Sequence, residues 1–253
     1  MTPSTEEKDR IEFIRRYSTF NAFTNQSLTK QELATMLGVS RPTAHRIVTH
    51  FEARQVIIKR GGRYELTRYG EIVGAAVTRY AQEVTAATAL AETLNSLPQE
   101  MALDHTLFST ATVTVATSDN PFSPVTRLLE LLEGSTTLNA FNTRFLEPLY
   151  VDRLRQQIDS IEFHLIYTPS VLALVERECP EFIETVTTSS RHSISVHDEL
   201  PLMLSILDSR VGIGVSPADG GTPIRWVDTG EPDAHTWASD MFESYRTDAT
   251  RRY

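Results

Sequence analysis

The chain has little lysine and only one cysteine. Its three lysines, Lys8, Lys30 and Lys59, all lie in the first sixty residues, and its other permanently charged basic residues are arginines. Beyond residue 59 the sequence therefore excludes a lysine Schiff base, a Walker-type phosphate loop and the His-x-Lys pair of phospholipase-D-type enzymes. Cys179 cannot form an internal disulfide, and its apolar helical context favours a buried core residue over a redox sensor.

Long apolar runs are also absent. The sequence contains no stretch of about eighteen apolar residues, and its amino terminus lacks the apolar region of a signal peptide. We therefore expect a cytoplasmic protein without a membrane partner, and no cofactor is indicated. A length of 253 residues suffices for one or two domains, each with its own core.

Residues 31–51 have the pattern of a helix, a short turn and a second helix. Gly38 supplies the conformation that ends the first helix, Ser40 caps the second, and Pro42 falls in a first turn, where its missing N–H costs nothing. Apolar residues recur at helical spacing in both helices, at Leu33, Ala34, Leu37, Ala44, Ile47, Val48 and Phe51. This is the shape of a DNA-reading unit.

The exposed side of the second predicted helix suits a DNA major groove. Arg41 and Arg46 can each bind a guanine edge with two hydrogen bonds, and the hydroxyl of Thr43 can read either kind of base pair. We expect Arg41, Thr43 and Arg46 to read bases, with help from Ser40 and His45. Pro42 belongs to the same DNA-binding surface.

A tight hairpin is predicted directly after the second helix. Residues 56–67 read as two short strands joined at Gly61-Gly62, a pair that favours a two-residue turn. Helix-turn-helix and hairpin together predict a winged helix. The side chains expected to hold the DNA backbone are Lys30, Gln31, Lys59, Arg60 and Arg63. The alternative is a small helical domain with a solvated charged face.

Charge is distributed unevenly along the chain. Residues 1–70 hold twelve Lys or Arg against seven Asp or Glu, whereas residues 71–253 hold twelve against twenty-six, which gives a net charge of −9. A basic amino-terminal part suits DNA and an acidic remainder avoids it. An acidic surface with arginine in place of lysine also suggests a salt-adapted organism, and this hypothesis predicts folding and DNA binding that persist in molar potassium chloride.

Three parts are predicted along the chain. Residues 1–67 form the winged helix-turn-helix domain, residues 68–96 a long connecting and dimerisation helix without proline, and residues 108–253 a domain that senses a ligand. The boundary between domains is expected near residues 95–108. A first helix, around residues 5–20, is expected to bury Ile11, Ile14 and Phe20 and to turn Phe13 and Tyr17 toward a dimer partner.

The last of these parts alternates strand-like and helix-like segments, which predicts an α/β fold with parallel strands. The strands are expected at 111–116, 137–141 and 162–167, and the helices at 124–133, 148–158 and 169–185. Closely spaced strands at 193–196, 202–207, 211–215 and 224–227 imply hairpins and a mixed sheet, which a helix at 233–249 follows.

Polar residues follow three of the predicted strands. Open α/β sheets bind ligands at the carboxyl ends of parallel strands, so a small polar or anionic metabolite is expected there. The candidate residues are Thr117, Ser118, Asn142, Arg144, Thr168 and Ser170. The alternative is that these are ordinary turn and cap residues.

Little in the sequence points to catalysis. His192, His197, Asp198 and Glu199 suggest a metal or acid–base pair, but strand alternation would place the two histidines on opposite faces of a sheet. Surface or hydrogen-bonded histidines are therefore the favoured interpretation, and neither catalytic nor metal-binding residues are assigned.

The order of parts resembles a family of archaeal winged-helix regulators, abundant in halophilic archaea, whose carboxyl-terminal domain is like the middle domain of the methanogenesis filamentation regulator. The resemblance covers most of the chain and is carried by residues 28–34, 38–43, 66–67 and 237–246. It implies a dimeric transcriptional regulator with an effector domain, and it brings no catalytic residues.

We therefore predict a sequence-specific DNA-binding regulator and not an enzyme. Its expected partners are double-stranded DNA, a second copy of the chain and, as a hypothesis, a small-molecule effector. A dimer would place two half-sites about one turn of B-DNA apart. The alternatives are a protein-interaction module whose winged helix does not read DNA, and an enzyme that is tethered to DNA.

Overall fold

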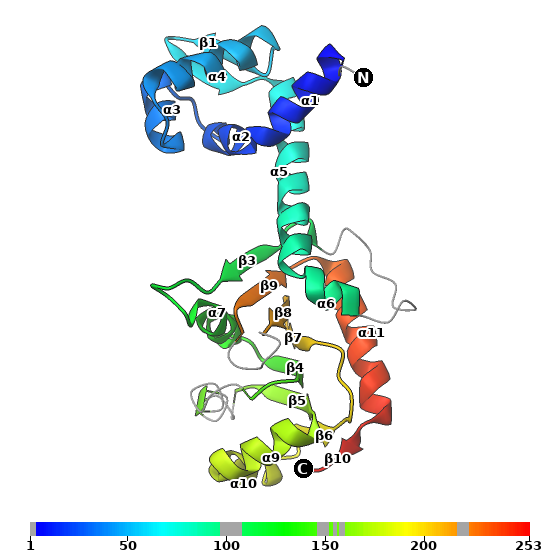
Figure 1. Ribbon diagram of the computed structural model, residues 1–253. Helices are drawn as coiled ribbons and strands as arrows, with labels where there is room; N and C mark the ends of the chain where they lie inside the picture. The colour runs from blue at the N-terminus through cyan, green and yellow to red at the C-terminus, as the bar shows by residue number, and fades with distance from the viewer. Residues whose placement is uncertain (1–3, 97–107, 146–151, 154–155, 157–159, 217–222) are drawn as a thin grey trace. The chain divides into compact units, whose positions relative to one another are not determined.

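The computed structural model consists of two compact units, Met1–Gln82 and Glu83–Tyr253 (Figure 1). Together they combine helices with a large mixed sheet, so the predicted α/β class with an amino-terminal helix-turn-helix is confirmed. The structure describes residues 4–96, 108–145, 152–153, 156, 160–216 and 223–253. Most of the boundary predicted near residues 95–108 and most of the helix predicted at residues 148–158 lie outside the described residues.

The amino-terminal unit contains helices and one hairpin. In chain order its elements are α1 (Thr5–Arg15), α2 (Tyr17–Phe23), α3 (Lys30–Leu37), α4 (Arg41–Ala53), β1 (Ile57–Arg60), β2 (Arg63–Leu66) and the first part of α5 (Arg68–Ala89). Three aromatic rings meet in its core: the ring centroid of Phe13 lies 5.9 Å from those of Phe20 and Phe51, which are 5.0 Å apart. These contacts fasten α1 and α2 to α4.

The predicted inner face of the first helix was wrong. Ile11 and Ile14 are 51% and 39% exposed, whereas Phe13, expected at a dimer surface, is buried together with Phe20. The physical reason is a break at Arg16, where φ is −113° and the first helix ends. A pattern extrapolated through one unbroken helix therefore selects the wrong side of α1.

Helix α5 begins close to the hairpin and the core of this unit. Thr67 caps the start of α5, because its hydroxyl oxygen accepts a hydrogen bond from the backbone N–H of Gly70 at 3.0 Å. A β-carbon on residue 70 would lie 2.0 Å from the carbonyl oxygen of Val56, and one on Gly74 would lie 2.8 Å from the ring of Phe20. Both glycines therefore permit a close approach that a side chain would prevent.

The long helix is shorter than the sequence predicted. α5 ends at Ala89, and a separate helix α6 (Ala91–Ser96) follows after Leu90. The division between the two units falls within α5, between Gln82 and Glu83. Among the helices that the structure describes, none is long and apolar enough to cross a membrane.

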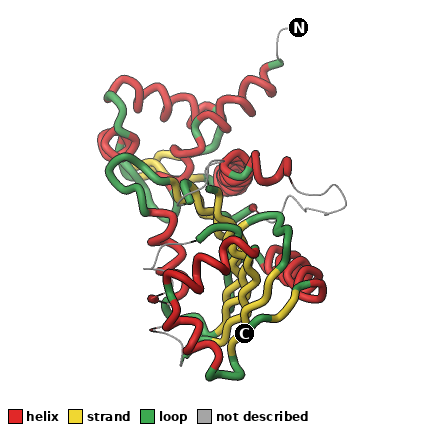
Figure 2. The backbone as a smooth tube through the Cα atoms, turned by 60° about the horizontal axis from the view of Figure 1, so that its bottom comes forward, coloured by secondary structure: helices red, strands yellow, loops and turns green. Residues whose placement is uncertain are grey.

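The carboxyl-terminal unit is built on a large sheet, whose strands are yellow in Figure 2. Its strand order is β10-β6-β5-β4-β7-β8-β9-β3. Only β4, β5 and β6 run parallel, and every other neighbouring pair is antiparallel. The strands are β3 (Thr112–Val115), β4 (Thr137–Asn142), β5 (Glu162–Tyr167), β6 (His192–Val196), β7 (Met203–Leu207), β8 (Val211–Val215), β9 (Arg225–Thr229) and β10 (Thr250–Arg251).

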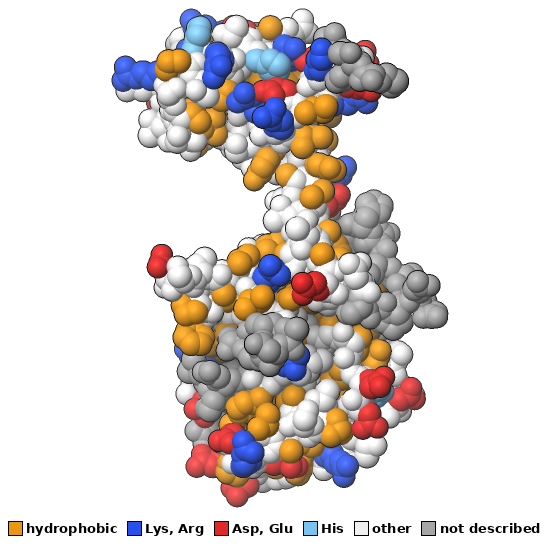
Figure 3. Space-filling model, viewed as in Figure 1, with side chains coloured by type: hydrophobic (Ala, Val, Ile, Leu, Met, Phe, Trp, Pro, Cys, Tyr) orange, Lys and Arg blue, Asp and Glu red, His pale blue; other side chains and the backbone are white. Residues whose placement is uncertain are grey.

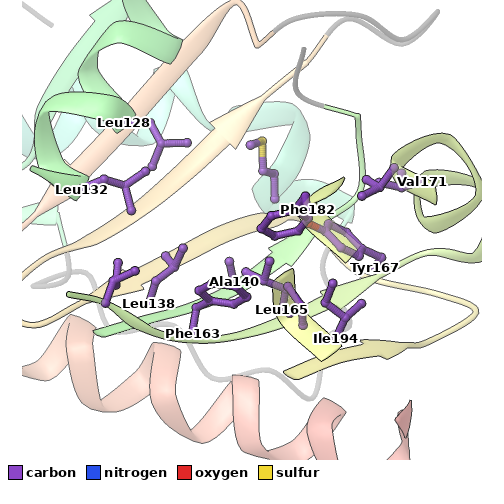
Figure 4. Packing of buried hydrophobic residues seen from close by; sticks show 14 of the residues in the cluster. Leu128, Leu132, Leu138, Ala140, Phe163, Leu165, Tyr167, Val171, Phe182 and Ile194 are labelled. Atoms are coloured by element: carbon purple, nitrogen blue, oxygen red, sulfur yellow. The ribbon is translucent and has the colours of Figure 1, made fainter. Parts of the chain in front are cut away.

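Helices cover both faces of this sheet. One face packs against α7 (Ser123–Leu132), α9 (Pro169–Glu178) and α10 (Pro180–Thr187), as the side chains in Figure 4 illustrate. The other face packs against the end of α5, α6 and α11 (Pro232–Asp248), through residues such as Leu90, Leu94 and Phe242. The sheet is therefore the middle layer between two apolar cores.

The structure corrects the expected role of the first strand in this unit. β3 does not join the parallel strands: it pairs antiparallel with β9 at the edge of the sheet. Strands β7, β8 and β9 lie between β3 and β4. Alternation of strand and helix along the sequence predicted adjacent parallel strands, but pairing with β9, far along the chain, gives β3 its place.

Candidate nucleic-acid interface

The turn between α3 and α4 is held by local hydrogen bonds. At the start of α3, Thr29 and Glu32 form a capping box, in which the Glu32 carboxylate accepts from the Thr29 backbone N–H at 2.7 Å. Gly38 ends this helix with φ at 63°, in the left-handed region that glycine adopts readily. Ser40 then caps α4 by accepting from the backbone N–H of Thr43 at 3.3 Å. The predicted helix-turn-helix is thus formed by its own sequence signals.

The buried side of α4 fixes which residues face outward. Four apolar residues point into the core, at Ala44, Ile47, Val48 and Phe51. Arg41, Pro42, His45 and Arg46 are consequently exposed, and Thr43 is half-buried. Within the described ranges, Arg41 and Arg46 have neither a hydrogen bond nor an ion pair from their side chains, so both guanidinium groups are available to a ligand.

The hydroxyl groups at the start of α4 are already engaged. Ser40 Oγ lies 2.9 Å from Thr43 Oγ1, in addition to accepting from the Thr43 backbone. Their positions are therefore fixed by the cap, and only their remaining hydrogen-bonding capacity is open to a base edge.

A lysine from α3 reaches the exposed face of α4. Lys30 Nζ lies 2.8 Å from Nδ1 of His45 and 5.7 Å from the ring centroid of Tyr64. Lys59 from the hairpin lies 5.9 Å from the same ring. Two cations therefore flank one aromatic ring, which favours them through its electron-rich face. Figure 3 shows Lys and Arg side chains on the surface of this unit.

The hairpin has the predicted tight turn. Arg60 pairs with Arg63 across Gly61 and Gly62, whose φ angles are 54° and 84°. Positive φ at both central positions is the geometry that glycine permits in a two-residue hairpin loop. An isolated bridge from Leu28 to β2 joins the hairpin to the segment before α3.

Two of the arginines expected to hold the DNA backbone have partners within the chain. Arg63 donates to the carbonyl of Ser27 at 2.7 Å and to the Glu32 carboxylate at 2.8 Å. Arg60 forms an exposed ion pair with Glu65 at 3.1 Å. Arg63 therefore fastens the hairpin to α3. Gln31 is exposed beside Lys30 in the first turn of that helix.

The Glu32 carboxylate joins the helix cap to the hairpin. The hydrogen bond from the Thr29 backbone, then that from the Thr29 hydroxyl, hold the pKa of Glu32 below its usual value, and the bond from Arg63 acts in the same direction. The sequence contained a signal for the first part of this arrangement, because Thr29-x-x-Glu32 has the spacing of a capping box. The bond to Arg63 is not local, and the sequence did not reveal it.

The residues expected to bind a small ligand fall into two separated groups. Asn142 is the last residue of β4, where it pairs with Tyr167 of the parallel neighbour β5, and Arg144 follows β4. Thr168 and Ser170 follow β5. Thr117 and Ser118 follow β3, which three strands separate from β4. The structure thus brings four of the six residues to adjacent strand ends.

The side chains of these two groups differ in their hydrogen bonds and in their exposure. Asn142 is 2% exposed and its amide has no hydrogen-bond partner among the residues that the structure describes. Arg144 is exposed, and the hydroxyl of Thr168 lies 3.3 Å from that of Ser170. Thr117 accepts from the backbone N–H of Asn120 at 3.1 Å, which is an ordinary turn contact.

The histidines considered for catalysis lie on opposite sides of the sheet, as predicted. His192 stacks on Phe163 with ring centroids 4.2 Å apart, whereas His197 contacts Tyr245 at 5.0 Å on the other side. His197 and Asp198 line a hollow of about 630 Å³ beside the β6–β10 edge. Among the described residues, no group of three or more His, Cys, Asp or Glu side chains could hold a metal ion.

Comparisons with known families match both units. A family model for the middle domain of the methanogenesis regulatory protein FilR1 matches residues 121–248, and one for the HVO_A0261 N-terminal domain matches residues 6–89. No curated relative matches the chain.

Several solved structures are distantly similar. One is TrmBL2, an archaeal chromatin protein with a novel mode of DNA binding. The match has a TM-score of 0.47 and 13% sequence identity, and it covers 97% of this chain and 99% of the TrmBL2 chain. The match to Nuc, a phospholipase D family member from Salmonella typhimurium, has a TM-score of 0.45 and 12% sequence identity. It covers 56% of this chain and 98% of the Nuc chain. NucT from Helicobacter pylori has a TM-score of 0.46 and 9% identity with the same coverage. These similarities are too low to support a functional argument.

Proposed function

This chain belongs to the family of the FilR1 middle domain, and on that premise we propose that it is a transcriptional regulator, of archaeal type, that binds double-stranded DNA by sequence. The observation that carries the proposal is the pair of guanidinium groups of Arg41 and Arg46 on the exposed side of α4, which have no partner among the described residues. Such groups can bind guanine in the major groove. The preceding capping box and the following hairpin support a winged helix-turn-helix as the reading unit.

We assign different roles to the side chains around this helix. Arg41, Thr43 and Arg46 read bases, with Ser40, Pro42 and His45 beside them. Side chains at its border contact the phosphate backbone, namely Lys30, Gln31, Lys59 and Arg60. Arg63 positions the hairpin through Ser27 and Glu32, and its backbone contact is limited to the donors that these bonds leave open.

A binding experiment tests the proposal directly. Duplexes selected from a random pool by the full chain are compared with scrambled duplexes at several salt concentrations. The chain is expected to prefer its selected duplex by about 10³-fold or more. The Arg41→Ala/Arg46→Ala variant should lose this preference. The Arg10→Ala/Arg15→Ala variant loses the same amount of charge from exposed positions on α1 and should keep the preference for the selected duplex.

The alternatives give different results in the same experiment. A protein-interaction module would enrich no sequence, and the chain would bind selected and scrambled duplexes equally. Equal losses in both double variants would mean that the α4 arginines act only through their charge. Turnover that depends on His192 or Asp198 would favour an enzyme tethered to DNA.

We also propose that the regulator is a homodimer joined through α5. Tyr69, Ile72 and Tyr80 are 50%, 66% and 49% exposed, and their spacing places them along one side of this helix. Exposed apolar side chains in a stripe are typical of a helix that pairs with another. The full chain should sediment as a dimer and Ile72→Glu as a monomer, whereas Phe122→Glu, at another exposed apolar position, should not change its mass. A monomeric wild-type chain would exclude the dimer.

We further propose that the carboxyl-terminal unit binds a small-molecule effector and that the protein is adapted to concentrated salt. Asn142, Arg144, Thr168 and Ser170 lie at adjacent strand ends, where an open α/β sheet can hold an effector, whereas Thr117 and Ser118 lie apart from them. A regulator of this kind acts in the cytoplasm with the genome. The acidic balance of the carboxyl-terminal unit also supports adaptation to concentrated salt, and unfolding of the chain in molar potassium chloride would exclude that adaptation.

A further inference from the structure

A hollow of about 630 Å³ lies beside the β6–β10 edge of the large sheet, in the region of Figure 1 that contains α9 and the mark C. Its walls are one side of α9, the end of β6, the end of α11 and the segment Thr250–Tyr253. All of these elements belong to the carboxyl-terminal unit. Pockets that hold small molecules are commonly of this size.

The hollow lies at the carboxyl ends of two parallel strands. β5 ends at Tyr167, and Pro169 at the start of α9 lines the hollow. β6 ends at Val196, which lines the hollow together with the two residues that follow it. Open α/β sheets bind ligands at the carboxyl ends of parallel strands. The position of the hollow is therefore the one expected for an effector.

Strand register places the wall from the sheet on the face that α9 covers. Thr250 is paired with Val196, and paired residues of neighbouring strands share a face. The backbone N–H of Arg252 still bonds to β6, at the carbonyl of Ile194, at 2.9 Å. Ile194 and Val196 belong to the core beneath α9. Thr250 and Arg252 therefore lie on the same side of the sheet as α9.

A hydrogen bond joins two walls of the hollow. The phenol of Tyr253 donates to Oε1 of Glu176 on α9 at 2.7 Å. This bond, followed by burial, raises the pKa of Tyr253 above its usual value, so the phenol keeps the proton that it donates. The backbone N–H of Tyr253 also bonds to the carbonyl of Ile194 at 3.1 Å. The walls are thus held by contacts within the chain, and a ligand does not have to assemble them.

Charged side chains of both signs line the hollow without partners. The carboxylates of Asp198 and Asp248 and the guanidinium of Arg252 form neither a hydrogen bond nor an ion pair with any residue that the structure describes. His197 is engaged, because its Nδ1 accepts from the backbone N–H of Glu199 at 3.2 Å. A carboxylate only accepts hydrogen bonds and a guanidinium only donates them. The hollow therefore offers partners for an ammonium group and for a carboxylate.

The wall formed by α9 is largely apolar. Pro169, Leu172 and Ala173 lie along one side of this helix, which their spacing brings together, and all three line the hollow. Val196 adds an apolar side chain from the sheet. Glu176 completes this side of α9, but its carboxylate already accepts from Tyr253. A ligand that fits the hollow therefore combines two opposite charges with an apolar part.

We propose that this hollow binds a free α-amino acid with an apolar side chain. Asp198 and Asp248 bind its ammonium group, Arg252 binds its carboxylate, and its side chain lies against Leu172, Ala173 and Val196. A simple anion would meet two carboxylates, and a simple cation would leave the guanidinium without a partner.

This site rests on the sensing part of the proposed function and deepens it, because it names a zwitterion as the effector class. Binding of the amino acid does not require DNA, so the assays contain none. A failed assay overturns the site and leaves the DNA-binding proposal standing, while a chain that binds an amino acid but reads no DNA sequence has the opposite result.

The charged groups of the probe give the first test. The full chain is titrated in a calorimeter at neutral pH with L-leucine and L-phenylalanine, each compared with its amide and its N-acetyl derivative. The amide lacks the carboxylate, and the N-acetyl derivative lacks the ammonium group. Saturable binding of at least one amino acid is expected, with both of its derivatives weaker by about tenfold or more. An amide that binds as tightly as the amino acid would show an acidic surface only and overturn the ligand class.

Variants of the chain give the second test. Arg252→Gln should weaken the amino acid by about tenfold and leave its amide unchanged, because the amide has no carboxylate to lose. Asp198→Asn/Asp248→Asn should weaken both probes. Arg177→Gln is the control, because this arginine of α9 pairs with Glu178 and does not line the hollow.

The unliganded Tm of each variant shows that it is folded, and it should match wild type because the three altered side chains of the hollow are exposed. Wild type that binds neither amino acid would overturn the site. Equal losses in Arg252→Gln and Arg177→Gln would do so as well, because binding would then not depend on the hollow.

Discussion

The ammonium nitrogen of Lys30 lies 2.8 Å from Nδ1 of His45. A lysine ammonium can only donate, so Nδ1 of His45 is the acceptor in this contact. The first turn of α3 is thereby bonded to the exposed side of α4, beside Arg41 and Arg46. This contact connects a residue proposed to hold the DNA backbone with the residues proposed to read bases.

Lys30→Gln should weaken binding to all duplexes by a similar factor. It removes one cation near the phosphates, so the slope of log affinity against log salt should decrease by about one unit. Binding isotherms on selected and scrambled duplexes at four salt concentrations measure this slope. A loss confined to the selected duplex would show that Lys30 acts through His45 on base reading instead.

Arg46→Ala and Lys59→Ala should have different effects on specificity. Arg46→Ala should cost about 1–3 kcal/mol on the selected duplex and relax the preference at one base position. Lys59→Ala should weaken binding uniformly and lower the salt slope, because Lys59 lies at the hairpin and not on α4. Affinities for a set of singly substituted duplexes distinguish these outcomes. Equal effects of both variants on all duplexes would contradict the base-reading role of Arg46.

Gly70→Ala should destabilise the amino-terminal unit. Alanine normally stabilises a helix relative to glycine by about 1 kcal/mol. A β-carbon at residue 70, however, would lie 2.0 Å from the carbonyl oxygen of Val56, which is backbone and cannot rotate away. The net loss should reach about 1–3 kcal/mol in chemical denaturation. At Gly74→Ala the nearest atoms belong to the side chain of Phe20, so this change should cost less, and the reverse order would contradict this packing.

The Glu32 cap should make stability depend on pH in the acidic range. Its pKa in the folded chain is lowered from the ordinary value of 4.5, first by the Thr29 backbone hydrogen bond. A lowered folded-state pKa means that the stabilisation is complete above pH 4.5 and is lost as the pH falls through the lower folded-state value. Thermal unfolding from pH 7 to pH 3 should therefore show a smaller acid loss in Glu32→Gln than in wild type. Glu52→Gln, which removes another exposed carboxylate of this unit, is the control. Parallel profiles for wild type and Glu32→Gln would contradict the role of the cap.

The amino-terminal unit was predictable because its signals are local. Gly38, Ser40 and the apolar spacing of α4 act within one or two helical turns, and each has the role that the sequence indicated. The error concerned α1, where a break at Arg16 shifts the buried side to Phe13. Local periodicity cannot reveal such a break unless a glycine or proline marks it.

The carboxyl-terminal unit was predictable only in part, because its sheet depends on distant pairing. β3 and β9 are neighbours although more than one hundred residues separate them, and nothing near β3 in the sequence indicates this partner. Asn142 could be found from its position at the carboxyl end of a parallel strand.

The most direct test of the central claim is genome-wide occupancy of the tagged chain by chromatin immunoprecipitation. Wild type, Arg41→Ala/Arg46→Ala and the charge-matched Arg10→Ala/Arg15→Ala are compared at equal expression. A sequence-reading regulator predicts discrete promoter peaks with a shared pseudo-palindromic motif for wild type and the α1 variant, and their loss in the α4 variant. Absence of peaks in wild type, or peaks that persist without Arg41 and Arg46, would contradict the account.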